Sequence, residues 1–314
     1  MKRHHAMNTT TDDLPATDAT HVSGDGINMA TGAVVVAVLV ILSASVVSIV
    51  GNILVCIVIH RSRRLQSTTN YYITSLALCD LLVTLGVMPF VTAEVIENQW
   101  PFGYVLCKIV RCLQYWMLGT AMWILTGISE DRYYTIIYPL SPRIRHSRTM
   151  RLIAVCFVVT CLLSLPTLYL HGLDTIEGVQ YCSSVYFNSD DSLLGKVLIP
   201  LYLLLVFFAP ITAITCSYVR LFRYIWEPGH AGRTLQRTVN SVPRSKVTML
   251  KMIIKTSCVV TALLLPFVAC HLWYLSLSGG STVTSHYTYL AATILHLLSC
   301  SAKPGKNLVC FAFL

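Results

Sequence analysis

The chain has 314 residues, of which 55% are hydrophobic and only 12% are charged. This composition is too apolar for an ordinary water-soluble domain, in which about a quarter of the residues are charged. The net charge of +9 does not indicate a nucleic-acid-binding protein, because the basic residues gather beside apolar segments, as they do on the cytoplasmic face of a membrane protein. The expected surroundings are therefore a lipid bilayer.

Seven apolar segments are long enough to cross a hydrocarbon core of about 30 Å, which takes about 20 helical residues. The predicted spans are residues 33–60, 69–96, 104–137, 149–171, 194–225, 247–277 and 285–311. Prolines inside several spans predict kinks, because neighbouring helices can satisfy the freed carbonyl groups. These are Pro89, Pro166, Pro210, Pro266 and Pro304. The expected fold is an all-α bundle of seven transmembrane helices over residues 33–314, after a tail of residues 1–32.

Charge predicts the orientation of the bundle. The loops after spans one, three and five carry most of the arginines and lysines, whereas acidic residues dominate the other side, where the few cations include Lys108 and Arg111. The positive-inside rule makes the basic loops cytoplasmic, so the N-terminus is outside and the C-terminus inside. Because no signal peptide is recognised, the first span is expected to direct insertion. Asn8, in an Asn-Thr-Thr triplet, is then a candidate glycosylation site.

Two cysteines are expected to form a disulfide bond on the outer side. Cys107 begins the third span and Cys182 lies in the loop before the fifth, so both face an oxidising compartment. Cys112, one or two turns deeper, is the competing partner. The cysteines within spans are expected to act as small buried hydrophobic residues.

The third span ends in charged residues. Asp131, Arg132 and Tyr133 follow Cys107 by about 25 residues, or about 37 Å of helix, which is one bilayer crossing. A charge at the end of a membrane helix usually only anchors the helix in the headgroups. Here a carboxylate adjoins the arginine, and such a pair can open and close as part of a two-state switch.

Several motifs together resemble those of the rhodopsin-like (class A) G-protein-coupled receptors, over nearly the whole chain. They are Gly51-Asn52, "LALCD" ending at Asp80, "WPFG" at Trp100–Gly103, Cys107, Asp131-Arg132-Tyr133, Pro210 with Tyr218, and Pro266. The resemblance implies a plasma-membrane receptor whose outer cavity binds an agonist and whose inner face binds a heterotrimeric G protein. By position, Arg132 would contact the G protein after release from Asp131, and Tyr218 would help to hold the open state.

The resemblance also implies a polar core near the middle of the bilayer. Asp80 is the usual sodium-binding residue of the family, and Asn52 belongs to the same core. Lys303 stands beside Pro304, where most relatives have a small polar residue, and its side chain is long enough to reach Asp80. We expect Lys303 to replace the sodium ion, because an ammonium group beside a buried carboxylate favours the charged form of both. The alternative is that Lys303 faces a water-filled cavity.

The predicted ligand site lies at the outer mouth. Gln114 stands where amine receptors carry an aspartate, and Leu297 stands where visual pigments carry their retinal lysine, so a biogenic amine and a light sensor are disfavoured. Aromatic walls and an acidic rim favour a basic peptide, although such a rim can equally be an ordinary solvated surface. The rim residues are Glu94, Glu97, Asp174, Glu177, Asp190 and Asp191. The expected ligand-binding residues are Glu94, Gln114, Tyr115, Phe267, His271, Tyr274 and Thr293.

Departures from the family pattern bear on signalling. Leu264 replaces the tryptophan of the sixth span, and Lys246 stands where some relatives carry a glutamate that binds the switch arginine. Asn307 replaces a tyrosine near the end, and the chain stops at Leu314 without the expected eighth helix and phosphorylated tail. Lys246 would repel Arg132 and so favour an open inner face, whereas the altered sixth and seventh spans keep open an alternative function, a signalling-impaired decoy or scaffold.

Two other classes of membrane protein explain the sequence less well. A transporter would show inverted repeats and broken, glycine-rich helices in matching halves, and no repeat is seen. A membrane enzyme would cluster histidines and carboxylates as in H-E-x-x-H, or carry G-x-S-x-G or a P-loop, and none of these patterns occurs. We therefore expect no enzymatic activity, no cofactor and no metal site.

Overall fold

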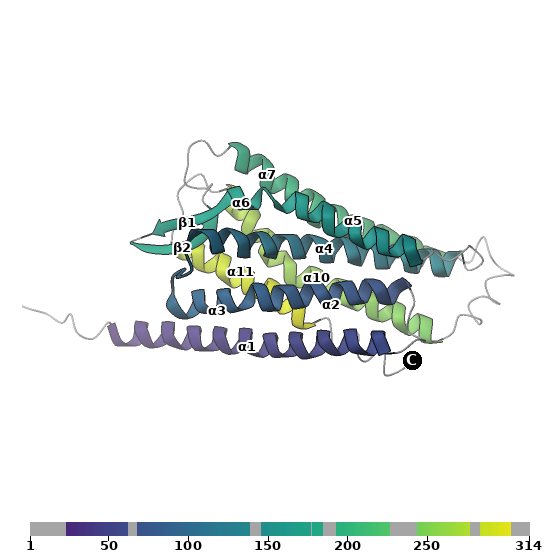
Figure 1. Cartoon of the computed structure of the whole chain (residues 1–314), viewed down its shortest axis with the longest axis horizontal. Helices are drawn as coiled ribbons and strands as arrows, with labels where there is room; N and C mark the ends of the chain where they lie inside the picture. The colour runs from purple at the N-terminus through teal and green to yellow at the C-terminus, as the bar shows by residue number, and fades with distance from the viewer. Residues whose placement is uncertain are drawn as a thin grey trace, which may run out of the picture.

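The computed structural model describes residues 23–61, 68–138, 146–176, 178–184, 193–226, 244–276 and 283–302. They form a bundle of long helices with a β-hairpin at one end (Figure 1). The elements are α1 (Ser23–Arg61), α2 (Thr68–Gly86), α3 (Met88–Glu97), α4 (Gly103–Ile137), α5 (His146–Ser164), α6 (Thr167–Leu170), β1 (His171–Ile176), β2 (Val179–Ser184), α7 (Leu193–Leu203), η3 (Leu204–Phe208), α8 (Ala209–Trp226), α10 (Arg244–Ser276) and α11 (Val283–Ala302).

The helices group into segments at the positions of the seven predicted spans. The second span consists of α2 and α3, the fourth of α5 and α6, and the fifth of α7, η3 and α8. The first helix begins at Ser23 rather than at residue 33, and the predicted end of the last span, residues 303–311, lies outside the described residues. The predicted helical bundle is confirmed in the part of the chain that the structure covers.

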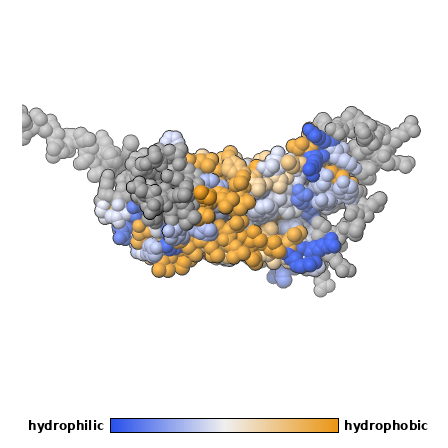
Figure 2. All heavy atoms as spheres, turned by 90° about the horizontal axis from the view of Figure 1, so that it is seen from above, coloured by the Kyte–Doolittle hydropathy of each residue, from blue (hydrophilic) through white to orange (hydrophobic). Residues whose placement is uncertain are grey.

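An apolar belt surrounds the middle of the bundle. Figure 2 shows it as a hydrophobic band between more hydrophilic ends. Among the described residues, the helical segments long and apolar enough to cross a membrane are Thr31–Arg61, Thr68–Glu97, Ser147–Leu170 and Val197–Tyr224, with shorter apolar helices at Ser257–Cys270 and Leu290–Ala302. α4 contacts α2, α5, α8, η3 and β1, so it is the central helix of the bundle.

Prolines lie at the breaks in three spans, and Pro166 directly precedes α6 in the fourth. Pro89 lies in the first turn of α3, directly after the break at Val87, because a proline has no N–H to continue the hydrogen-bond ladder of α2. The wide π-helical turn η3 immediately precedes Pro210, the second residue of α8. Such a turn is a common way to absorb an interrupted ladder.

α4 packs closely against α5 and η3. A Cβ atom on Gly119 would lie 3.1 Å from Cγ1 of Val206 and 3.3 Å from Cβ of Thr160. The hydroxyl groups of Thr120 and Thr160 lie 2.6 Å apart, and Nε1 of Trp116 donates a hydrogen bond to a carbonyl oxygen of α5 at 2.9 Å. Small residues permit this close approach, as in other membrane helix pairs.

The substitution Gly119→Val tests this packing. We expect it to lower the free energy of unfolding by about 1–3 kcal/mol, because two γ-methyl groups would enter a filled space between three helices. The control is Gly32→Val, since no atom lies within 4 Å of a Cβ on Gly32. Thermal unfolding of the purified protein in detergent measures both variants, and equal midpoints would contradict the close packing.

Candidate functional site

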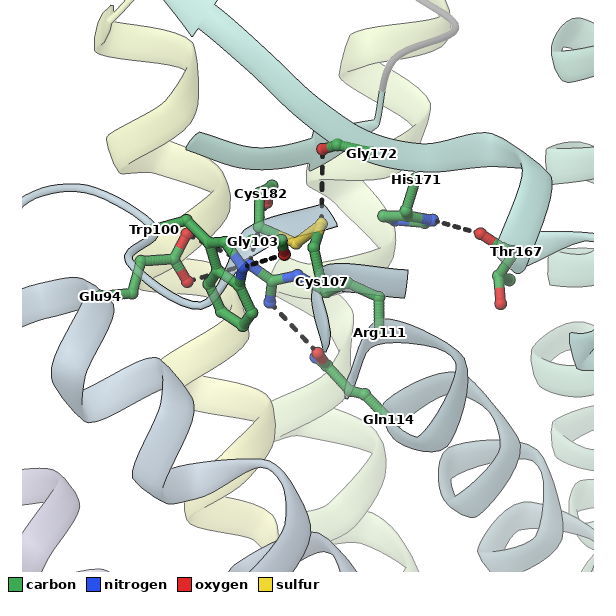
Figure 3. The surroundings of a disulfide bond; sticks show 10 residues. All are labelled: Glu94, Trp100, Gly103, Cys107, Arg111, Gln114, Thr167, His171, Gly172 and Cys182. Carbon is green, nitrogen blue, oxygen red and sulfur yellow. Dashed lines mark hydrogen bonds and ion pairs between the residues drawn. A yellow bond between two sulfur atoms is a disulfide. The ribbon is translucent and has the colours of Figure 1, made fainter. Parts of the chain in front are cut away.

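The β-hairpin is attached to the outer end of α4 by a disulfide bond. β1 and β2 pair in antiparallel register, with Leu173 opposite Cys182. Cys182 is joined to Cys107 with an S–S distance of 2.02 Å (Figure 3). This is the predicted pair. The alternative partner, Cys112, instead has its Sγ 3.7 Å from the carbonyl oxygen of Ser164.

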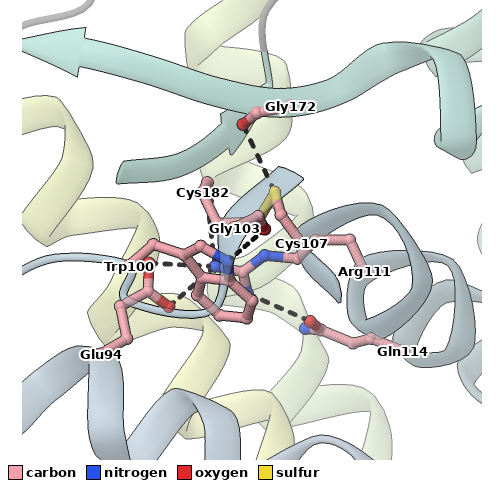
Figure 4. Close-up of polar contacts among 8 residues, drawn as sticks. All are labelled: Glu94, Trp100, Gly103, Cys107, Arg111, Gln114, Gly172 and Cys182. Carbon is pink, nitrogen blue, oxygen red and sulfur yellow. Dashed lines mark hydrogen bonds and ion pairs between the residues drawn. A yellow bond between two sulfur atoms is a disulfide. The ribbon is translucent and has the colours of Figure 1, made fainter. Parts of the chain in front are cut away.

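A buried ion pair lies directly beneath the disulfide (Figure 4). Nη2 of Arg111 lies 3.0 Å from Oε2 of Glu94, and both side chains are 0% exposed. The same nitrogen donates to the carbonyl oxygen of Cys182 at 3.1 Å, while Nη1 donates to Oε1 of Gln114 at 3.3 Å. Arg111 therefore connects α3, α4 and β2. Burial of two charges requires such additional hydrogen bonds, because the Coulomb attraction alone rarely offsets desolvation.

Glu94 does not lie on an exposed acidic rim. Its exposed fraction is 1%, so the expectation of a solvent-facing carboxylate at this position is wrong. The physical reason is Arg111, which was expected among the cations of the outer surface. One turn after Cys107, Arg111 points into the bundle and neutralises Glu94, whereas Glu97, at the end of α3, is exposed.

An aromatic and polar cluster continues from this pair toward α11. Nε2 of Gln114 and Nδ1 of His296 lie 3.4 Å apart. The ring of Phe267 lies 5.2 Å from that of His296 and 5.7 Å from that of Tyr115. Four of the predicted ligand-binding residues are therefore linked in one buried network that runs from Glu94 through Arg111 to Gln114, and from His296 through Phe267 to Tyr115.

The remaining predicted ligand-binding residues are Thr293, His271 and Tyr274. Thr293 is buried on α11, one turn before His296. The side chains of His271 and Tyr274 lie outside the described part of the chain. Arg111 and His296 were not predicted as members of the site. The available signal for Arg111 was its position three residues before Gln114, which places both on one helix face.

The inner end of α4 carries a second ion pair. Nη2 of Arg132 lies 2.7 Å from Oδ2 of Asp131, and the two side chains are 13% and 4% exposed. Oδ1 and Oδ2 of Asp131 also accept hydrogen bonds from Thr68 at 3.0 Å and Thr69 at 2.7 Å, and Arg132 contacts the hydroxyl of Thr69. The pair is therefore closed and joined to the start of α2. Tyr133 lies outside this network, with its ring 5.3 Å from that of Tyr134.

Two adjacent hydrogen bonds join α4 to α8 near the same end. The hydroxyl of Tyr218 accepts from Oγ of Ser129 at 3.1 Å. Oγ of the neighbouring Ser217 donates to Oε1 of Glu130 at 2.5 Å. Tyr218 thus contacts α4 at Ser129, about one helical turn before Arg132, in this closed arrangement.

Asp80, whose exposed fraction is 2%, lies among other buried polar residues, and this group is called the polar core below. The hydroxyl of Thr84 donates to the backbone carbonyl of Asp80 at 2.7 Å and lies 2.7 Å from that of Ser48. Nδ2 of Asn52 donates to Oγ of Ser48 at 3.1 Å. Lys303 lies outside the described residues, so its pairing with Asp80 stays a prediction, as does glycosylation of Asn8.

A small cavity separates this core from the outer network. It is lined by residues of α2, α4, α10 and α11, among them Asp80, His296 and the buried Leu264. Leu264 replaces the expected tryptophan, so the bulk that family members place here is absent from this wall. The cavity is thus lined by residues of both the polar core and the outer network.

The substitution Glu94→Ala tests the outer ion pair. We expect a loss of about 3–5 kcal/mol in the free energy of unfolding, because Arg111 would stay buried without its carboxylate. The double substitution Glu94→Leu with Arg111→Met should cost less, since it removes both charges. Glu97→Ala, at an exposed position, is the control, and thermal unfolding is the measurement. Equal midpoints for Glu94→Ala and Glu97→Ala would refute the pair.

Comparison with known proteins agrees with this arrangement. Residues 51–305 match the family described as 7 transmembrane receptor (rhodopsin family). The chain is 37% identical over 227 residues to Probable G-protein coupled receptor 19 of Rattus norvegicus, and to that of Homo sapiens, which covers 72% of this chain and 53% of each relative. It is 26% identical over 261 residues to the RYamide receptor of Tribolium castaneum, which covers 80% of this chain and 71% of that receptor.

The chain spans about half the length of the first of these relatives. The family match nevertheless extends over most of the chain and includes both ion pairs of α4. The chain therefore belongs to the rhodopsin family of seven-transmembrane receptors, as a multi-pass protein of the plasma membrane.

Proposed function

We propose that this chain is a receptor that transmits the binding of an extracellular peptide to a heterotrimeric G protein. The observation that carries the proposal is the closed Asp131–Arg132 pair at the inner end of the central helix. An arginine that is 13% exposed and held by one carboxylate and one hydroxyl is restrained by contacts that a modest helix movement can break.

The neighbouring hydrogen bonds supply a way to couple this release to α8. Tyr218 and Ser217 contact Ser129 and Glu130, which directly precede the ion pair on α4. A shift of α8 along α4 would break both contacts and release the hydroxyl of Tyr218 from Ser129. Because Ser129 and Arg132 lie one turn apart on α4, the freed hydroxyl would be near the arginine after its release from Asp131.

The outer network favours a peptide ligand. Gln114 offers a carboxamide that can both donate and accept, and the rings of Tyr115 and Phe267 supply aromatic surface. A basic group on the ligand would compete with Arg111 for Glu94, so binding would rearrange a contact that joins α3, α4 and β2. The similarity to the RYamide receptor also supports a peptide.

The experiment for the inner switch is agonist-independent G-protein activation in cells. We expect Arg132→Ala to lower the baseline of the intact chain, since the arginine would contact the G protein. Asp131→Asn should raise the baseline, because it removes the charge that holds Arg132. Arg151→Ala, at an exposed position on α5, is the charge-matched control, and all variants are compared at equal surface density. Unchanged baselines would favour the alternative, a signalling-impaired decoy or scaffold.

The experiment for the ligand is a screen of synthetic amidated peptides that includes RYamide. We expect at least one peptide to activate the G protein through the intact chain. Gln114→Leu should raise the half-maximal concentration about tenfold, the equivalent of one hydrogen bond. Glu97→Gln should leave that concentration unchanged. A chain with a measurable baseline that answers none of the peptides would contradict the peptide proposal.

A further inference from the structure

A second cavity lies on the side of the bundle, between α4, the α5–α6 corner and the α7–η3 segment. Leucines make up half of its lining residues, with Leu162 and Leu163 on α5 and Leu198 and Leu201 on α7. Tyr115 of α4 and Tyr202 of α7 are also in the lining. The cavity is therefore apolar with an aromatic inner wall.

The opening of this cavity faces the apolar belt. Leu162 and Leu201 line it and are 60% and 46% exposed on the outside of the bundle. Leu165, Val197 and Leu204 are exposed beside them. In a membrane-embedded chain, side chains exposed at this level contact acyl chains rather than water. A molecule that enters the cavity laterally therefore comes from the bilayer.

The aromatic wall separates this cavity from the predicted ligand region. The ring of Tyr115 lies 5.4 Å from that of Tyr202, whose hydroxyl donates to the backbone carbonyl of Tyr115 at 2.8 Å. The ring of His171, at the start of the hairpin, lies 5.2 Å from that of Tyr115 and is also part of the lining. Since His171 is buried, the outer end of the cavity is covered by the hairpin.

We propose that this cavity binds the acyl chain of a lipid in the outer leaflet. The leucine lining offers apolar contact to a hydrocarbon chain and little to a charged or water-soluble molecule. The hairpin marks the outer end of the bundle, so the cavity lies at the depth of outer-leaflet chains. Tyr115 also packs against Phe267, the residue after Pro266 in α10, at 5.7 Å. A lipid chain in the cavity would therefore affect the packing of α10 against Tyr115.

The test is photo-crosslinking in lipid nanodiscs. The intact chain is reconstituted in phosphatidylcholine that contains a trace of the same lipid with a diazirine on its acyl chain, irradiated, digested and analysed by mass spectrometry. We expect label at Leu162, Leu163 and Leu198 in excess of that at Val158 and Val197, which are exposed on the same helices but do not line the cavity.

Filling the cavity should remove that excess. Leu198→Trp places an indole in the cavity, whereas Val197→Trp places one on the adjacent lipid-facing position. We expect the first variant to lose the excess label at Leu162 and Leu163 and the second to keep it. Thermal unfolding in the same nanodiscs shows whether each variant is folded.

If Leu198→Trp does not fold, the pair Leu205→Trp and Leu204→Trp replaces it, since Leu205 lines the cavity and Leu204 is exposed beside it. Label spread evenly over the exposed residues of the belt would overturn the proposal. So would an excess that persists after the cavity is filled. Neither result would bear on the G-protein experiment, because the proposal stands on the lateral cavity alone.

Discussion

A charge inside a bilayer-spanning helix has to be paired, and the central helix of this receptor carries a paired charge at each end. Arg111 is neutralised by Glu94 at the outer end, and Arg132 by Asp131 at the inner end. An unpaired ion at either depth would be costly in free energy. The pairing constrains the neighbouring elements as well, because Arg111 also holds β2 and Asp131 also holds the start of α2.

The two pairs differ in burial. The outer pair is fully enclosed beneath the Cys107–Cys182 disulfide, which favours a fixed frame for the mouth of the receptor. The inner pair retains some exposure on Arg132, as the proposed release of this arginine would require. Between them, close packing of α4 around Gly119 provides a rigid connection on which helix movements can act.

The aromatic residues around Tyr115 link three regions of the bundle, which are the lateral cavity, the outer network and the polar core. On one side Tyr115 faces the lateral cavity, and on the other it packs against Phe267 and thereby approaches His296 and Gln114. A ligand at the mouth and a lipid at the side would therefore act on the same rings. Leu264 leaves the space below them without the large ring that relatives place there, so the route from these rings to the polar core runs through smaller side chains.

Composition and local motifs were sufficient to predict the helical bundle and its orientation, and they favoured the Cys107–Cys182 disulfide and the Asp131–Arg132 pair that the structure shows. These features depend on whether each segment faces lipid or water and on residues adjacent in the chain, and both can be recognised in the sequence alone. The form of the breaks within the helices was harder to predict from the sequence. The break at Val87 and the π-helical turn before Pro210 follow from how neighbouring helices accommodate a proline, which the proline alone does not specify.

Only the tertiary structure decided which polar residues meet. Glu94 and Arg111 lie on different helices, and so do Gln114 and His296, so their contacts depend on the rotation of each helix about its axis. The lateral cavity likewise exists only where α5 and α7 fail to close over Tyr115. The sequence by itself determined which segments must be buried in the membrane. Packing determined which residues pair with each other, because helix rotation and tilt are set by contacts between segments distant in the chain.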